Sequence, residues 1–183
     1  SKPHRVVAQA LQNIDSNLKN TETRNHKESS VERYKTLLFG QREKLGRVDR
    51  LDPFRPSKTI IAGGMNGGGR SHLHPFIART MSVRECARIQ TFSDNYEFTG
   101  SIARQFTQVG NAVPPLLAEK IACHILSKQY GKEVPQIFKH EKHLDIDTPI
   151  KELSHKILIR SLEEKPDWIY NSHSTMTREK KTA

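Results

Sequence analysis

The first stretch of the sequence whose residue types suit chemistry is a glycine-rich segment, residues 63–71. It holds five of the ten glycines in the chain and contains Arg70. Glycine backbone can approach another surface closely, and its N–H groups suit phosphate oxygens. The basic residues that precede or end this segment are Arg47, Arg50, Arg55, Lys58 and Arg70, and the glycines nearest to Arg70 are Gly67, Gly68 and Gly69. We predict that these residues contact DNA; a hairpin loop that contacts nothing is the alternative.

The same segment nearly matches a phosphate-binding P-loop, G-x-x-x-x-G-K-S. Gly64, Gly69 and Ser71 occupy the expected positions, but Arg70 replaces the lysine. Pro75 then prevents the helix whose N-terminus would hold the phosphates. The pattern therefore disfavours a nucleoside triphosphate site.

Other reactive side chains give weaker signals. His72 and His74 have no cysteine or carboxylate partner at metal-ligand spacing, so we interpret them as turn or packing residues. Cys86 and Cys123 fall in predicted helices and are expected to be small buried residues. Two cysteines also argue against a disulfide framework. With no signal peptide and no apolar run of membrane-spanning length, we expect a cytoplasmic protein.

Two predicted helices would hold the candidate functional residues named above in place. Ser82 and Glu85 form a capping box, which predicts a helix from Val83 to about residue 94. Arg84, Glu85 and Arg88 could form a catalytic cluster, but on a helix they are expected to pair with neighbouring loops.

The second helix follows Gly110 and Asn111, which are expected to form a tight turn. Pro114 and Pro115 suit the first helical positions. Apolar residues then recur every four positions and predict a deeply buried face: Val113, Leu117, Ile121 and Ile125.

Elsewhere the patterns predict helices within residues 3–14 and 32–46 and a strand over residues 59–62. Thr148 and Pro149 begin another helix, which ends near Pro166. Its apolar stripe fits either a lid on the preceding helices or a contact with a partner. The sequence has no internal repeats.

Charge is spread unevenly along the 183 residues, whose net charge is +10. Residues 1–80 carry 15 Lys and Arg against 7 Asp and Glu, whereas residues 81–183 are almost balanced. A basic excess on one part of a chain is typical of a nucleic-acid surface. The alternative is a solvated basic face.

Two runs of residues resemble the last two motifs of the DNA (cytosine-5) methyltransferases. The first begins Ser82-Val83-Arg84-Glu85-Cys86 and continues to Phe92, and the second is Gln108-Val109-Gly110-Asn111-Ala112-Val113-Pro114-Pro115. Arg50-Leu51-Asp52-Pro53, Pro56-Ser57-Lys58-Thr59-Ile60 and His74-Pro75 also fit the family, over roughly residues 25–130. Ser93 departs from it, because the family usually has proline there.

The resemblance implies an α/β fold, the C-terminal portion of a Rossmann-like S-adenosylmethionine-dependent methyltransferase with a small mixed α+β target-recognition lobe. It implies a lobe that reads DNA at residues 1–78 and a helical segment completing the catalytic domain at residues 79–130. We expect a helical extension at residues 131–170 and a disordered tail at residues 171–183.

The same resemblance implies that Asn111, Ala112 and Val113 contact the polar end of S-adenosyl-L-methionine. The family's glycine-rich cofactor loop, Pro-Cys nucleophile and Glu-Asn-Val motif are not in this sequence. We therefore expect a component that recognises double-stranded DNA, is inactive alone, and completes cytosine C5 methylation with a complementary chain or upstream segment. No residue is predicted to be catalytic or to bind metal. The alternative is a non-catalytic, sequence-specific DNA-binding module.

Overall fold

The structure is a computed structural model that describes residues 4–44, 48–62, 72–132 and 147–170. The helices in chain order are α1 (Val7–Leu11), α2 (Glu28–Lys35), α3 (Val83–Ile89), α4 (Ile102–Asn111), α5 (Pro115–Tyr130), α6 (Ile150–Glu164) and the short 3-10 helix η1 (Pro166–Trp168). The strands β1 (Asp49–Arg50) and β2 (His72–Leu73) pair in parallel, with Asp49 opposite His72. This mixed content fits a portion of an α/β methyltransferase.

The helix α3 begins where its local sequence predicts. Ser82 accepts a hydrogen bond from the Glu85 backbone N–H, and the Glu85 carboxylate accepts one from the Ser82 N–H at 2.6 Å. This reciprocal arrangement satisfies N–H groups that the first helical turn leaves without partners. The helix ends at Ile89, about five residues before the predicted end, because Thr91 adopts a left-handed conformation with φ of 66°.

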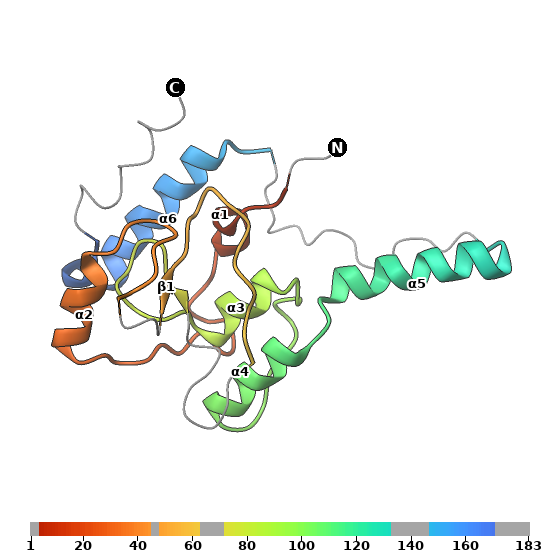
Figure 1. The fold of residues 1–183 in the computed structure, drawn as a ribbon, viewed down its shortest axis with the longest axis horizontal. Coiled ribbons are helices and arrows are strands. Elements are labelled where there is room, and N and C mark those ends of the chain that lie inside the picture. Colours follow the sequence, from red (N-terminus) through yellow and green to blue (C-terminus); the bar gives the residue numbers. More distant parts are fainter. Residues whose placement is uncertain (1–3, 45–47, 63–71, 133–146, 171–183) are drawn as a thin grey trace.

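One hydrophobic core joins segments from most of the sequence. The helix α1 packs against α3 and α6, and α3 packs against α4 (Figure 1). The core includes Val6, Met81, Phe106 and Ile157, so it draws on three of the four segments into which the sequence was divided. Leu153 and Ile157 of the apolar stripe of α6 are thus buried in this core, with α6 packed on α1, and of the two roles left open by the sequence the structure favours the lid.

A second, smaller core lies around α2 and the C-terminal end of the described chain. Tyr170 is buried there together with Val31, Tyr34 and Leu73. The Tyr170 N–H donates to Phe76 O at 3.3 Å, and the Ala78 N–H donates to Trp168 O at 2.8 Å. These bonds fix residues 168–170 to the segment of residues 76–78.

Three local predictions were wrong. Residues 59–62 form no strand, and α2 ends at Lys35, which leaves Leu38 exposed. Gly110 and Asn111 are the last two residues of α4 rather than a turn. The turn instead lies at residues 112–114. The next helix begins at Pro115, because proline has no N–H and suits the first helical position.

The largest difference between the prediction from sequence and the structure concerns α5. It extends away from the rest of the described chain (Figure 1), and Glu119 is its only buried residue. Its predicted buried face is exposed: Val113 by 60%, Leu117 by 52%, Ile121 by 50% and Ile125 by 45%. The periodicity correctly identified an apolar face, but within the described residues no second surface covers it. Among the described helices, none combines the length and apolar character needed to cross a membrane.

Candidate cofactor turn and nucleic-acid interface

The predicted cofactor residues form the connection between α4 and α5, here called the cofactor turn (residues 111–113). Asn111 and Val113 are exposed and Ala112 is half-buried. Within the part of the chain that the structure describes, the Asn111 amide makes no hydrogen bond, so it keeps both a donor and an acceptor for a ligand. An exposed amide next to an exposed apolar side chain fits one edge of a binding site.

The cofactor turn is held at both sides by the end of α3. The Gln90 side-chain amide donates to Val109 O at 3.2 Å. The Leu116 N–H donates to the Thr91 hydroxyl at 3.2 Å, which satisfies one N–H of the first turn of α5. The two methyltransferase-like motifs therefore contact each other directly, and the first fixes the position of the second.

The cavity beside this connection is small. Its volume is about 120 Å³, and its lining includes Thr91 and Leu116. Ligand pockets for molecules of cofactor size typically occupy about 300–1,000 Å³. The larger cavity, about 580 Å³, lies elsewhere, between residues 11–23 and α6. The described residues thus enclose no pocket of cofactor size beside residues 111–113.

The predicted DNA-binding residues separate into three groups. Arg55 and Lys58 are exposed, with side chains 66% and 50% accessible. Each is paired with a buried aspartate: Arg55 lies 3.8 Å from Asp52, and Lys58 lies 2.8 Å from Asp49. Buried carboxylates thus orient both cations at the surface without removing them from solvent.

Arg50 occupies a different position. It is fully buried, and its guanidinium lies 4.1 Å from the centre of the Phe39 ring and 3.5 Å from that of Tyr170. It donates to Leu37 O at 2.7 Å and twice to Pro75 O, at 2.9 and 2.6 Å. Burial lowers its pKa to about 9, although the hydrogen bonds and rings hold a cation well. Arg50 therefore links residues of the second core to one another, and its side chain is not accessible to DNA in this conformation.

The third group, Arg47, Gly67, Gly68, Gly69 and Arg70, lies outside the described residues. The near P-loop, residues 64–71, also lies outside them. The sequence missed Arg42, which is 62% exposed and lies 4.0 Å from Asp49, beside Lys58. Its only sequence signal was its charge, because the antiparallel bridge that brings residue 42 to residue 49 is a tertiary contact.

The charged residues of α3 have structural roles. Arg84 donates to Lys19 O, Ser93 O and Tyr96 O at 2.6–3.0 Å, and Arg88 pairs with Asp94 at 2.5 Å. These contacts bind two loops to α3, as predicted for helical residues that pair with neighbouring loops.

Glu85 lies at the centre of a buried ionic network. Arg79 contacts it through two hydrogen bonds of 2.9 and 3.0 Å and also reaches Glu164 of α6 at 3.0 Å. Burial by itself would raise the pKa of Glu85, but Arg79, His74 and the Ser82 N–H outweigh it and lower the pKa to about 2. His74 is also buried and accepts from the Phe76 and Ile77 N–H groups, and burial lowers its pKa to about 3.

The burial of the two cysteines differs. Cys86 is fully buried, and burial raises the pKa of its thiol well above its ordinary value. Cys123 is half-buried on α5. Among the described residues no group of His, Cys, Asp or Glu is arranged to hold a metal ion.

The fold and these two motifs define part of a nucleic-acid-modifying methyltransferase of α/β type. A family model of C-5 cytosine-specific DNA methylases matches residues 3–127. The chain therefore belongs to the C-5 cytosine-specific DNA methylase family. This family is in general dependent on S-adenosylmethionine, and its substrate is DNA.

Several relatives resemble the chain over different shares of their own length. The type II methyltransferase M.AquIB of Picosynechococcus is 39% identical over 122 residues, which cover 57% of this chain and 85% of the relative. The DNA (cytosine-5-)-methyltransferase M.ApeKI of Aeropyrum pernix is 45% identical over 74 residues, or 40% of this chain and 15% of the relative. The type II methyltransferase M.AquIB places the chain among relatives of restriction–modification systems.

A solved structure supports the same assignment. It is a DNA modification methyltransferase encoded within an E. coli prophage, with a TM-score of 0.50 and 34% sequence identity. The match covers 57% of this chain and 27% of the solved chain. The chain thus corresponds to the C-terminal part of such methyltransferases, with the target-recognition region and the last two motifs.

Proposed function

We propose that this chain is the DNA-recognition component of a cytosine-5 methyltransferase whose catalytic motifs lie on a complementary chain or on an upstream segment. The observation that carries this proposal is the exposed apolar face of α5. It directly follows the cofactor turn, and exposed contiguous apolar surface is typical of an interface. A chain bearing the upstream motifs is the partner that would cover this face and complete the cofactor pocket.

In this arrangement the roles of the residues differ. Asn111, Ala112 and Val113 hold one edge of S-adenosyl-L-methionine, which supplies the methyl group when it is bound. Arg55 and Lys58 hold double-stranded DNA through its phosphates, and Arg47, Arg70 and Gly67–Gly69 belong to the same proposed interface. The complementary part supplies the nucleophile, since Cys86 is buried and not ionised.

The test is reconstitution. The purified chain should show no methyl transfer to duplex DNA, and it should form an active enzyme when mixed with a chain bearing the upstream motifs. If the single chain methylates cytosine, the half-enzyme proposal is wrong. If it binds one DNA sequence specifically but gains no activity from any such partner, it is instead a DNA-binding module.

Asn111→Ala tests the cofactor role in the reconstituted enzyme. Loss of one hydrogen bond to a charged ligand group should weaken cofactor binding by roughly 1.5–3 kcal/mol. DNA affinity should be unchanged. Unaltered cofactor titration with an intact fold would remove Asn111 from the site.

A further inference from the structure

Gly110 lies where the end of α4 meets the segment that precedes residue 63. It lies inside α4, next to Asn111, and its φ is not positive, so its backbone conformation does not require glycine. Helix propensity favours alanine over glycine at such a position. The reason for glycine must therefore lie in what surrounds it.

The surroundings of Gly110 leave no room for a side chain. A Cβ atom on Gly110 would lie 2.3 Å from Ala62 N, 2.5 Å from Ala62 Cα and 2.7 Å from Ile61 C. All three are backbone atoms, so no side-chain rotation relieves the overlap. Figure 1 shows the segment before residue 63 (gold) running down onto α4 (green).

The contact is supported on both sides. Ile60 is 4% exposed and belongs to the same core as Phe106 and Val109 of α4. Behind Gly110, Gln90 and Thr91 fix the cofactor turn to the end of α3. Residues 60–62 are therefore held against Val109 and Gly110 at the end of α4, with no intervening layer at Gly110.

We propose that Gly110 is a positioning residue that couples the cofactor turn (residues 111–113) to residues 60–62. Because backbone rests on backbone, a shift of residues 111–113 on cofactor binding moves residues 61–62, and displacement of residues 61–62 by DNA moves the cofactor turn. By linkage each ligand then alters the affinity of the other by the same factor. The assignment of these two ligands rests on the proposed function, whereas the contact itself does not.

The first experiment uses the full chain alone and measures Gly110→Ala. Overpacking should lower the melting midpoint by about 5 °C, and amides at residues 58–62 should exchange faster with solvent. Without the contact, alanine in a helix should instead raise the midpoint by about 1–4 °C. The sign of the shift thus decides whether the contact exists.

Gly131→Ala is the matched control. Gly131 has φ of +61°, so alanine is strained there, but nothing lies within 4 Å of the added Cβ. Because Gly131 ends α5, which extends away from the rest of the described chain, Gly131→Ala should leave the midpoint and the exchange at residues 58–62 nearly unchanged. If both variants change that exchange equally, the effect is general destabilisation and the coupling is overturned.

The second experiment needs no variant to fold. In the reconstituted wild-type enzyme, S-adenosyl-L-homocysteine should slow amide hydrogen exchange at residues 58–62. Target DNA should raise the affinity of the enzyme for S-adenosyl-L-homocysteine severalfold. Cofactor that binds without either effect overturns the coupling but leaves the proposed function standing. Failure of the cofactor to bind contradicts the proposed function, and the experiment on the chain alone still decides the Gly110 contact.

Discussion

The helix α3 carries the first methyltransferase-like motif, and α5 begins at Pro115, the last residue of the second, yet the two helices differ in which side chains they expose. In α3, Arg84, Glu85 and Arg88 are buried, and each finds partners within the chain. In α5, Leu117, Ile121 and Ile125 are apolar and about half exposed, and the helix extends away from the other described elements (Figure 1). A buried charge with partners belongs to a finished interior, whereas an exposed apolar face belongs to an interface. The helix α3 is therefore part of a closed interior, whereas α5 presents an apolar face that no described residue covers.

The largest effect should come from changing the exposed face of α5. Leu117→Lys with Ile121→Lys should weaken association with the complementary chain by on the order of 100-fold or more, because central apolar anchors dominate interface energy. Titration of that chain, with methyl transfer as the signal, measures this. Ser127→Lys, on another side of the helix, is the control and should associate normally. Equal losses in both variants would mean that the face makes no specific contact.

The ionic network of the body should respond next. Glu85→Gln removes the buried charge that Arg79 contacts through two hydrogen bonds, and it should lower the free energy of unfolding by about 3 kcal/mol. Glu164→Gln removes the other partner of Arg79, but that side chain is 40% exposed, so the loss should stay within about 1 kcal/mol. Urea unfolding measures both variants. Similar losses in the two variants would show that Glu164 of α6 stabilises Arg79 as strongly as Glu85 of α3 does.

The stability of the folded chain should fall on mild acidification. His74 is kept neutral in the folded chain by a pKa of about 3, whereas in the unfolded chain it takes up a proton below about pH 6.5. Its contribution is therefore complete above pH 6.5 and is lost as the pH falls toward 3, with a slope of at most about 1.4 kcal/mol per pH unit.

His74→Asn isolates this contribution. Asparagine can accept from the Phe76 and Ile77 N–H groups but does not titrate in this range. Between pH 5 and 7 the variant should lose less stability than the wild type, as measured by urea unfolding at each pH. The pKa of His72 is also lowered by burial, but His72 remains in both proteins. Identical slopes would mean that His74 takes up a proton equally readily in the folded and unfolded chains.

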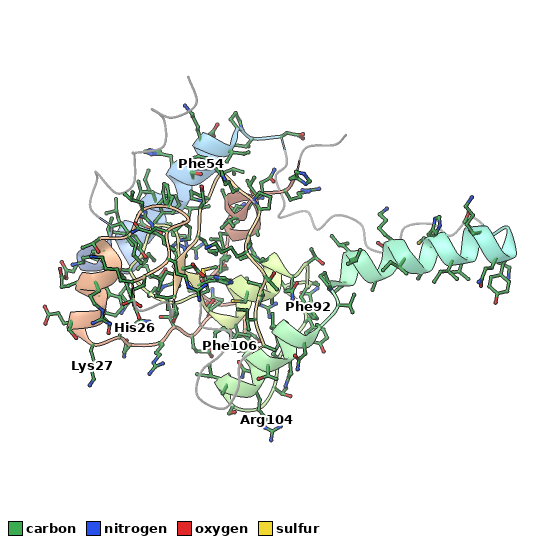
Figure 2. The ribbon with its side chains drawn as sticks, in the orientation of Figure 1. His26, Lys27, Phe54, Phe92, Arg104 and Phe106 are labelled. Atoms are coloured by element: carbon green, nitrogen blue, oxygen red, sulfur yellow. The ribbon has the colours of Figure 1, made fainter. Side chains whose placement is uncertain are left out.

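The smallest effects should come from the exposed cations. Arg55→Ala and Lys58→Ala should each reduce the slope of log affinity against log salt by about 0.9 if each residue neutralises one phosphate. Arg104→Ala is the control, because Arg104 points into solvent at the end of the body opposite Phe54, the neighbour of Arg55 (Figure 2). A control variant that lowers the slope equally would indicate general electrostatic attraction rather than this interface.

The sequence predicted those features whose causes are local. The capping box of Ser82 and Glu85 and the proline start of α5 depend on residues within one turn, and both were correct. The interior role of Arg50 was missed because its partners Phe39 and Tyr170 are remote in sequence. Gly110 was assigned to a turn because glycine suggests positive φ, whereas its actual constraint is the backbone of Ala62. Periodicity found the apolar face of α5, but periodicity cannot say whether another surface covers it.

The contrast between α3 and α5 can be measured directly by amide hydrogen exchange on the full chain, alone and mixed with a chain bearing the upstream motifs. We expect the amides of α3 to be protected in both samples. Those of α5 should exchange rapidly in the chain alone and become protected in the mixture, together with the appearance of methyl transfer. If α5 is as well protected as α3 in a monodisperse monomer, the chain closes its own core and the account of a component awaiting its partner is wrong.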